Sequence, residues 1–586
     1  MLQNTLQAAY TPGVNLKGEV AGASWMFLLP KLSLERTVCI GVPSRKQLKT
    51  MARLSREVVI CTDEPQSKTV DPGGISNLHV INITAGVPLP FAQQSVDLLV
   101  FASVRDLETH ARSLHALGAP DALTLDGVIF LEARGSLHLL HTTLLQARLQ
   151  RPADTILSFW INALGDEVHA AIPASDGTTI AYFARNGLFK APRDQSLPGR
   201  VGNFVRKRLH TLTHRAGALL PAGFTAAGEK GSPPREPNIS RQPAPRFGFF
   251  LGRGLTEQPP RYLCELAAAA GADIGAMRWG LVAPGDYASR KVLFFLINRE
   301  TARLEYIVKM TRDQTLNHRL EAARNALTLL ERKGIGTAQT LPRVAFSGTH
   351  GGLAILGETA IDGRPFRQAT QATADCPYAH AATDWLRKLA AATTTTATAE
   401  EAAARLEQLF TRFVELYRLA PSHKEFLAQQ IATLRRDPHP FPLVFQHGDP
   451  GTWNMLATDR HQVAFLDWEA AEPQGMPLWD LFYFLRSYSI IVARAQGTHN
   501  NLKGFAQHFL GNTALNRMIG EAIARYRETI GLSATAIGPL FYTCWMHRAL
   551  KEATRTAPAK LERGHYVNLL RLCIDKHDQL SLLTLR

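Results

Sequence analysis

The chain has 586 residues, with 65 basic and 50 acidic side chains and a formal net charge of +15 at pH 7. A hydrophobic fraction of 45% and a charged fraction of 20% are typical of a globular protein and exclude a disordered or fibrous chain. The excess of basic residues favours anionic partners, which include nucleotides, phosphorylated substrates, nucleic acid and acidic membrane surfaces.

Two further features narrow the class of protein. No apolar run reaches the length of about 18 residues that a membrane-spanning helix needs, and the start of the chain lacks the basic residues of a secretion signal. We therefore expect a cytoplasmic protein with no transmembrane segment. None of the six cysteines forms a C-x-x-C pair, which argues against a zinc site or a disulfide framework.

The first half alternates strand-like and helix-like segments. A helix is predicted at 46–54. An apolar run predicts a buried strand at 37–42, and further strands are predicted at 57–62, 79–84, 96–102 and 127–133. Alternation at this spacing predicts a doubly wound parallel sheet, in which ligands bind at the carboxyl ends of the strands.

Two of these runs resemble a known family. The sequence LPF at 89–91, a few polar residues and the strand at 96–102 resemble the fourth-strand region of class I S-adenosylmethionine-dependent methyltransferases. The run at 127–133 resembles the next strand of that family. The resemblance covers about residues 31–190, and it implies that Gly41 and Asp63 are the positions that would bind S-adenosylmethionine.

The loop after the first predicted strand departs from the family pattern. Methyltransferases of this class carry an acidic residue and two or three glycines there, whereas this chain keeps only Gly41. Pro43, Ser44 and Arg45 occupy positions at which the backbone must approach the cofactor closely. The resemblance therefore implies a degenerate methyltransferase-like domain, and binding of S-adenosylmethionine is left open.

A stretch rich in Gly, Pro, Ser and Ala divides the chain. Beyond it, two β-rich runs within 292–310 predict a hairpin, 315–333 predicts a helix and 352–358 predicts a strand. The predicted parts are a lead segment at 1–30, a methyltransferase-like domain at 31–221, a linker at 222–247 and a second domain at 248–586. The second domain comprises a small β-rich lobe at about 279–360 and a helical lobe at 361–586, which is the outline of a kinase-like phosphotransferase.

One segment of the second domain carries a set of side chains suited to phosphoryl transfer. The sequence VFQHGDPGTWNML contains Asp449 and Asn454, and the sequence VAFLDWE follows with Asp467. Phosphoryl transfer from a nucleotide needs a carboxylate that orients the acceptor hydroxyl and hard oxygen ligands that hold magnesium. These three side chains supply such a set, and the short loop between Asp449 and Asn454 allows both to face one cleft.

The same segment resembles the aminoglycoside phosphotransferase and choline kinase group, which shares the protein-kinase-like fold. The resemblance covers about residues 248–586. It implies that Asp449 is the catalytic base and that Asn454 and Asp467 are metal ligands. It also implies structural roles in the catalytic loop for His447 and Asp480.

The nucleotide side is less sharply defined. Lys309 ends a predicted strand, as a lysine that pairs with the α- and β-phosphates should, and Glu321 or Glu331 on the next helix would orient it. The loop that ends at Ser289 lies where a phosphate-covering loop belongs, although it lacks the G-x-G-x-x-G pattern. Glu358 matches the segment between the lobes, where backbone groups would bind adenine.

Together these features predict a kinase that uses ATP and Mg²⁺ to phosphorylate a hydroxyl of a small molecule such as a sugar, amino sugar or amino alcohol. Trp453, Glu469, Tyr483 and the helices near Trp545 would form the acceptor pocket, or equally a core. Two alternatives remain open, namely a scaffold made of two inactive enzymes and a bifunctional methyltransferase–kinase. No nucleic-acid partner is expected.

Overall fold

The computed structural model describes residues 23–63, 75–83, 91–103, 106–107, 119–134, 151, 154–164, 167–186, 188, 246–283 and 290–580. The chain forms two compact units. The described residues of the sheet unit lie within 23–316 and 345–357, and those of the helical unit are 317–344 and 358–580. No helix in the described part of the chain is long and apolar enough to cross a membrane.

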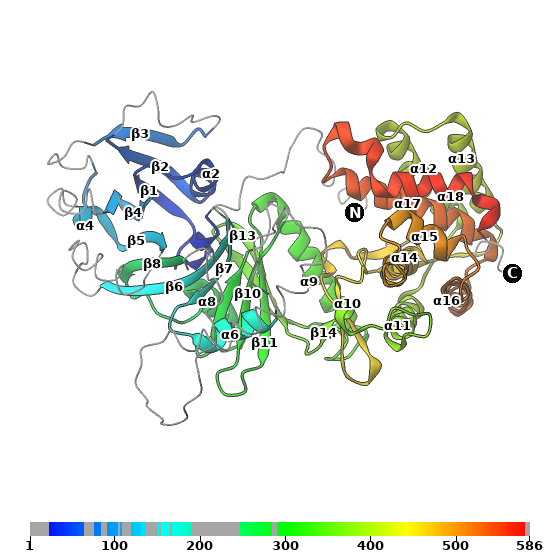
Figure 1. Cartoon of the computed structure of the whole chain (residues 1–586), viewed down its shortest axis with the longest axis horizontal. Helices are drawn as coiled ribbons and strands as arrows, with labels where there is room; N and C mark the ends of the chain where they lie inside the picture. The colour runs from blue at the N-terminus through cyan, green and yellow to red at the C-terminus, as the bar shows by residue number, and fades with distance from the viewer. Residues whose placement is uncertain are drawn as a thin grey trace, which may run out of the picture. The chain divides into compact units, whose positions relative to one another are not determined.

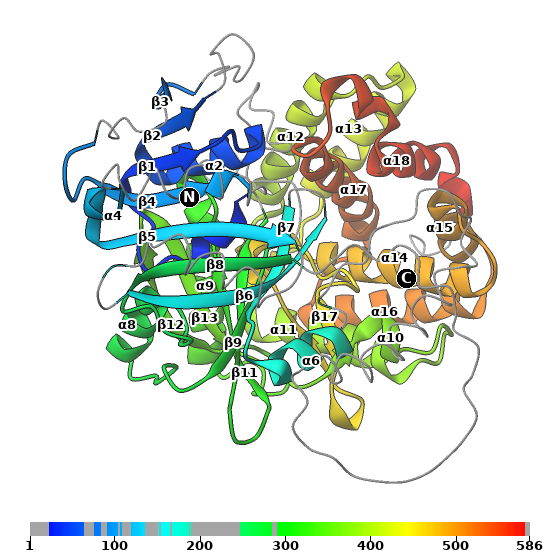
Figure 2. The same ribbon diagram turned by 60° about the vertical axis from the view of Figure 1, so that its left-hand side comes forward.

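The sheet unit is built on one sheet, which has 13 strands among the described residues. Their order is β3-β2-β1-β4-β5-β8-β6-β7-β9-β10-β11-β13-β12. Figure 2 shows β1, β4, β5, β8 and β6 side by side in that order. The strands are β1 (Leu34–Ile40), β2 (Ser55–Thr62), β3 (Leu78–Asn82), β4 (Val96–Phe101), β5 (Leu123–Arg134), β6 (Asp154–Leu164), β7 (Glu167–Pro173), β8 (Arg246–Arg253), β9 (Arg278–Val282), β10 (Val292–Ile297), β11 (Leu304–Met310), β12 (Val344–His350) and β13 (Leu353–Thr359).

Strands β1 to β5 form the predicted parallel sheet, with every neighbouring pair parallel. Strand β1 lies between β2 and β4, so the strand order reverses there, and such a reversal is the usual ligand position of an open α/β sheet. The predicted helix at 46–54 is α2 (Arg45–Leu54). It begins at Ser44, whose side chain accepts from the Gln47 amide in a capping box.

Strand β8 belongs to the sheet of the first half, although the predicted boundary of the second domain falls within it. It is antiparallel to β5 on one side and to β6 on the other. Phe249, Phe250 and Leu251 on this strand are buried. The compact units therefore do not follow the predicted boundary, and most of the predicted linker at 222–247 lies outside the described residues.

The sheet continues from the first half into the predicted small lobe. Strand β9 pairs with β7, in the register Ala171↔Leu281, and with β10 on its other edge. The predicted hairpin is confirmed, because β10 and β11 are antiparallel neighbours. The sheet unit also contains helices, which among the described residues are η1 (Ser24–Leu28), α2, α4 (Ala119–Ala122), α6 (Gly177–Arg185), α8 (Arg261–Ala269) and η3 (Gln314–Leu316).

Aromatic side chains link the two parts of this sheet into one hydrophobic core. The Trp25 ring stacks on Phe130 at 3.6 Å, and Phe130 lies 4.9 Å from Phe250. Phe159 lies 5.4 Å from Phe250 and 5.7 Å from Trp279, which is on β9. Figure 1 shows the green strand β8 between the cyan strands β5 and β6. The core is therefore shared by the first half and the small-lobe strands.

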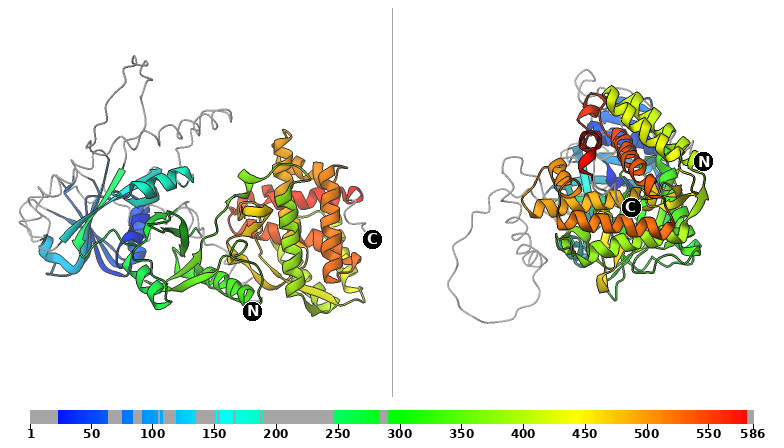
Figure 3. Two further views of the ribbon diagram at one scale, coloured as in Figure 1. Left: turned by 90° about the horizontal axis from the view of Figure 1, so that it is seen from below. Right: turned by 90° about the vertical axis from the view of Figure 1, so that its right-hand side faces the viewer.

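The helical unit is a bundle with two small sheets (Figure 3). Its central helices α14 and α17 are buried on nearly all faces, and most of their buried side chains are apolar. The predicted helix at 315–333 is α9. The helices are α9 (Asn317–Arg332), α10 (Phe366–Ala369), α11 (Pro377–Thr393), α12 (Ala399–Leu416), α13 (Pro421–Arg435), α14 (Trp479–Ala495), α15 (Asn501–Phe509), α16 (Ala514–Ile530), α17 (Ile537–Ala553) and α18 (His565–Asp575). The small sheets are β14 (Arg364–Pro365), β17 (Met455–Ala457) and β18 (Val463–Phe465), and β15 (Thr395–Ala397), β16 (Phe441–Gln446) and β19 (Glu472–Gly475).

Candidate active site

A tight turn follows strand β16 and carries the candidate catalytic residue. Gly448 has a left-handed backbone, with φ +77°. A Cβ at this position would collide with the backbone carbonyl of Ala470, so only glycine fits. The Asp480 carboxylate, in the first turn of α14, accepts the backbone N–H of His447 at 2.6 Å and that of Gly448 at 3.0 Å. Asp480 therefore fixes the backbone of the turn at His447 and Gly448.

The environment of Asp480 is apolar enough to alter its titration. Burial raises the pKa of the Asp480 carboxyl to about 7, although the two amide hydrogen bonds and the charge of Lys551 act in the opposite direction. Lys551 on α17 reaches the same turn, where it donates to the Gly448 carbonyl at 3.1 Å. Burial, together with the charge of Arg548, lowers the pKa of Lys551.

His447 connects the turn to the strand that precedes Asp467. Its Nδ1 accepts the backbone N–H of Asp449 at 3.2 Å, and its Nε2 lies 3.0 Å from the Leu466 carbonyl. The side chain is fully buried, and burial lowers the pKa of His447 to about 4. At neutral pH the imidazole is therefore uncharged, and the tautomer that fits both contacts carries its proton on Nε2.

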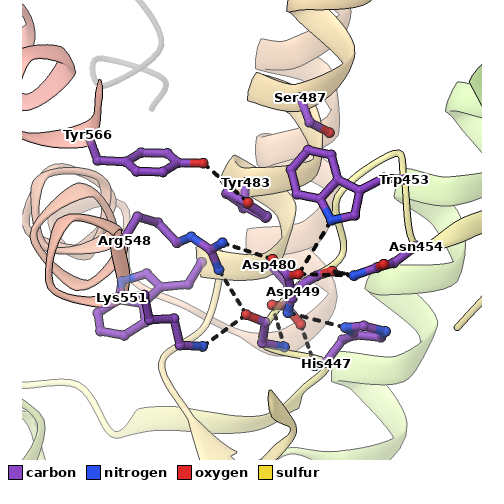
Figure 4. Close-up of polar contacts among 12 residues, drawn as sticks. His447, Asp449, Trp453, Asn454, Asp480, Tyr483, Ser487, Arg548, Lys551 and Tyr566 are labelled. Atoms are coloured by element: carbon purple, nitrogen blue, oxygen red, sulfur yellow. Dashed lines mark hydrogen bonds and ion pairs between the residues drawn. The ribbon is translucent and has the colours of Figure 1, made fainter. Parts of the chain in front are cut away.

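Asp449 lies at the centre of a converging set of donors (Figure 4). Asn454 Nδ2 donates to its Oδ2 at 3.0 Å, and Arg548 Nη2 pairs with its Oδ1 at 2.8 Å. Burial alone would raise the pKa of the Asp449 carboxyl, but the charges of Arg548 and Lys551 outweigh it and lower that pKa. The side chain remains 31% exposed, so an ionised carboxylate is accessible to a ligand.

Asn454 and Asp467 flank the same end of a short hairpin. Strands β17 and β18 are antiparallel in the register Met455↔Phe465, and the Leu466 amide donates to the Asn454 carbonyl at 2.8 Å. Asp467 follows with a left-handed φ of +69°, which turns the chain directly after the strand. The pairing of β17 with β18 therefore holds Asn454 and Asp467 at the same end of the hairpin.

The orientation of the Asn454 amide suits a hard cation. Its Nδ2 donates to both the backbone and the side chain of Asp449, so its Oδ1 points the other way. Within the described residues no hydrogen bond to this oxygen is recorded. An amide oxygen and a carboxylate are ligands that Mg²⁺ prefers, so Asn454 and Asp467 fit this metal chemically.

The predicted nucleotide-side residues are distributed over both units. Lys309 is a buried residue of β11 in the sheet unit, whereas Glu321 is exposed on α9 in the helical unit. Their pairing stays a prediction. Glu358, at the end of β13, is buried, and Ser289 lies outside the described residues. In the first half, Gly41 has φ +83° and Asp63 is exposed.

The structure adds residues to the site that the motif did not contain. Arg548 and Lys551 lie one turn apart on α17, and Tyr566 on α18 reaches Tyr483 by a hydrogen bond of 3.2 Å between hydroxyls. The signal in the sequence is a pair of cations within an otherwise apolar helix, which requires buried partners. Trp545, considered for the acceptor pocket, is fully buried.

Several solved structures of small-molecule kinases resemble this chain at low overall similarity. A glucosamine kinase in complex with glucosamine, ADP and inorganic phosphate has 16% identity over 56% of this chain and 84% of that one, with a TM-score of 0.33. An aminoglycoside phosphotransferase from Streptomyces rimosus, in complex with ADP and streptomycin, has 16% identity over 50% and 98%, with a TM-score of 0.29. A choline/ethanolamine kinase family protein from Mesorhizobium loti has 16% identity over 52% and 92%, with a TM-score of 0.28.

These scores are too low for the ligands of those proteins to be transferred to this chain. No curated protein matches the sequence. Residues 284–508, however, match the phosphotransferase enzyme family, and this range contains the turn with Asp449 and the hairpin with Asn454 and Asp467. The carboxy-terminal half of the chain therefore carries a domain of the phosphotransferase enzyme family.

Proposed function

We propose that this chain is a kinase that uses ATP and Mg²⁺ to transfer the γ-phosphate to a hydroxyl of a small molecule. The observation that carries the proposal is the bridge from Asn454 to Asp449, which sets an accessible carboxylate beside an amide oxygen suited to a metal. Asn454 Oδ1 and the Asp467 carboxylate would hold Mg²⁺. When bound, this ion would neutralise charge on the triphosphate.

Asp449 has the central role in the proposed transfer. Its ionised carboxylate accepts a hydrogen bond from the acceptor hydroxyl and receives the proton as the acceptor oxygen bonds to the γ-phosphorus. The bond between that phosphorus and the bridging oxygen breaks, and ADP leaves with the electron pair. Because the pKa of Asp449 is lowered, the carboxylate is a weak base at neutral pH, and orienting the hydroxyl is its larger contribution.

The remaining site residues support this geometry in the proposal. His447 and Asp480 hold the turn that presents Asp449. Lys309 is assigned to the α- and β-phosphates, with Glu321 as its orienting partner, and Ser289 to the loop over the phosphates. The segment around Glu358 is assigned to adenine through backbone groups. The match of residues 284–508 to the phosphotransferase enzyme family supports these assignments.

A matched pair of variants tests the proposal. In Asp449→Asn the side chain keeps its shape and loses its basicity, so ATP-dependent phosphorylation of a responsive acceptor should fall by about 10²–10⁴-fold. Asp459→Asn makes the same change at an exposed position of the neighbouring hairpin and should leave the rate unchanged. ADP release and product mass are measured over a panel of hydroxylated metabolites. Equal rates in the two variants would remove Asp449 from its assigned role.

We infer a second, structural function for the first half, as a methyltransferase-like domain that does not bind S-adenosylmethionine. The strand order β3-β2-β1-β4-β5, with the antiparallel β8 between β5 and β6, supports the methyltransferase-like assignment. A Cβ built on Gly41 would lie 2.5 Å from the Asp106 carboxylate, so Asp106 occupies space directly over the loop. Ser103 Oγ holds that carboxylate at 2.6 Å.

Calorimetry with S-adenosylmethionine tests this second assignment. With Asp106 over Gly41, we expect no heat of binding and no rise in melting temperature at millimolar cofactor, because only a ligand that binds the native state stabilises it. Micromolar binding would overturn the assignment and would favour a bifunctional methyltransferase–kinase. Absence of binding by both S-adenosylmethionine and Mg-ATP would favour a scaffold instead.

A further inference from the structure

We propose that the acceptor is a hydroxyl compound that carries an oxyanion, a phosphate or a carboxylate, and that Arg486 and Arg367 bind this group beside Asp449. The inference rests on the proposed phosphotransferase function and names the class of its acceptor. It comes from arginine side chains of the helical unit that have no acidic partner among the described residues.

Aromatic rings surround the catalytic carboxylate (Figure 4). The Arg548 guanidinium, which pairs with Asp449, lies 3.5 Å from the centroid of the Tyr483 ring. Tyr483 lies 5.8 Å from Trp453 on one side and 6.1 Å from Tyr566 on the other, measured between ring centroids. Trp453 is 44% exposed, so an aromatic surface next to the Asp449 carboxylate is accessible to a ligand. Such rings suit the carbon skeleton of a sugar or polyol.

Arg486 lies beyond Tyr566 and is nearly buried. Its guanidinium is 5.0 Å from the centroid of the Tyr566 ring, and its side chain is 6% exposed. Nη2 contacts Nε2 of His565, while Nε is buried without a hydrogen-bond partner. Burial and the charge of Arg486 lower the pKa of His565 to about 3, so this histidine is neutral and its Nε2 accepts from the guanidinium without supplying a negative charge. A guanidinium removed from water without a carboxylate is unfavourable unless a ligand supplies the anion.

Arg367 approaches the same region from α10. Its guanidinium lies 5.2 Å from the Trp453 ring centroid, and its Nε donates to Thr452 Oγ1 at 3.0 Å. Burial and the positive charges of Arg494 and Arg486 lower the pKa of Arg367. Arg494 and Arg486 therefore lie close enough for their charges to disfavour the charged form of Arg367.

The resulting balance of charge selects among acceptors. The Asp449 carboxylate is already paired with Arg548, and among the described residues Arg486 and Arg367 form no ion pair with a carboxylate, so their charges are not neutralised within the protein. An ammonium group on the acceptor would meet these cations and be repelled. A phosphate or carboxylate would accept the paired N–H donors of a guanidinium, which is the strongest neutralising geometry that arginine offers. The site therefore fits an acidic acceptor better than an amino sugar or amino alcohol.

Binding by matched compounds tests this inference on the full chain. Glucose 6-phosphate or gluconate, glucose and glucosamine form one set of acid, neutral and amine members, and glycerol 3-phosphate with glycerol forms another. Calorimetry and melting temperature are measured for each. In the set that binds, the acid should bind about tenfold or more tightly than the neutral member, the effect of one hydrogen bond to a charged group. A neutral or amine member that binds as tightly as its acid, or no binding by any acid at millimolar concentration, would overturn the inference.

Variants then locate the oxyanion group. Arg486→Met should weaken binding of the acid by about tenfold and leave the neutral member within about twofold. Arg486→Lys keeps the charge and loses the paired donors, so its affinity for the acid should lie between those of the unmodified chain and Arg486→Met. The melting temperature of each variant shows whether the helical unit stays folded. Arg525→Met is the control, because it removes a cation whose side chain is 70% exposed, and it should leave the affinities for the acid and the neutral member unchanged. Unchanged acid preference in a folded Arg486→Met variant would overturn the assignment.

Nucleotide binding in the same preparation separates the two proposals. A chain that turns over ATP with an amine acceptor and rejects acids keeps the phosphotransferase function and loses this inference. A chain that turns over no ATP with any acceptor loses the proposed function, and calorimetry still decides whether its site prefers acids. A phosphorylated acid identified by mass spectrometry would support both.

Discussion

A chain that begins at Gly248, the predicted start of the second domain, should not be stable by itself. Strand β8 lies between β5 and β6 and is hydrogen-bonded to both. Removal of residues 1–247 deletes both neighbours and leaves this strand without partners. Its central side chains Phe249, Phe250 and Leu251, which are 1%, 2% and 1% exposed in the full chain, would then face water.

The size of the effect follows from this burial. Removing one large apolar side chain from water contributes about 1.5–3 kcal/mol, so three contribute about 5–9 kcal/mol. The whole free energy of unfolding of a domain is typically about 5–15 kcal/mol. The unpaired backbone groups of β8 and the loss of the pairing between β7 and β9 add to the cost. We therefore expect the truncated chain to aggregate or to melt far below the full chain.

Thermal unfolding and light scattering of the two chains check this expectation. A point variant of the full chain isolates the strand from the other losses. Phe250→Ala should lower the free energy of unfolding of the sheet unit by about 3–5 kcal/mol, because it leaves a cavity among aromatic rings. Leu125→Ala on β5 is the matched control; its side chain is 55% exposed, and the change should stay within about 0.5 kcal/mol. A monomeric truncated chain that melts like the full chain would refute the reasoning.

Three further predictions concern the helical unit. Asp480→Asn leaves one of two buried backbone N–H groups facing an amide nitrogen, so the free energy of unfolding should fall by about 1–3 kcal/mol and kcat should fall with it. Thermal unfolding and steady-state rates measure the two effects. Unchanged values would contradict the role of Asp480 in holding the turn at Gly448. Arg548→Met removes the largest charge that lowers the pKa of Asp449, so the carboxylate should protonate at higher pH. The acid limb of the pH profile of kcat/KM should therefore move to higher pH. An acid limb at the same pH would show that Arg548 does not set the pKa of Asp449. Asn454→Ala should raise the Mg²⁺ concentration for half-maximal rate by roughly 10–100-fold, read from a magnesium titration with Asp459→Asn as control.

Much of the local structure follows from periodicity and spacing. The parallel strands can be predicted because buried strands of a parallel sheet, such as β1, β2 and β4, are continuous apolar runs, whereas β3 is only partly buried. The hairpin of β10 and β11 was predicted from two β-rich runs with a short polar connection. Asp449 and Asn454 could be placed together because five residues of a tight turn cannot separate them far, and the observed hydrogen bonds are of this local kind.

Long-range pairing could not be predicted in the same way. The run FGFFLG at 247–252 is apolar, but nothing within it indicates that its neighbours are β5 and β6 rather than a strand of the second domain. The ion pair between Arg548 and Asp449 joins residues 99 positions apart. The cations of α17 indicate that buried partners exist, but nothing in the helix identifies Asp449 as one of them. The pairing of Lys309 with Glu321 depends on both units and stays a prediction.

The continuous sheet gives the first half a structural role that requires no cofactor. Strand β7 pairs with β9, β9 with β10, and β10 with β11, which carries Lys309. The strand assigned to the nucleotide phosphates is thus supported by pairing and by an aromatic core that begin in the first half. Substitutions in that core should therefore lower phosphotransferase activity through stability, whereas substitutions of exposed residues near the Gly41 loop should not. In this arrangement the first half extends the sheet that carries Lys309 and supports the proposed phosphotransferase function through stability.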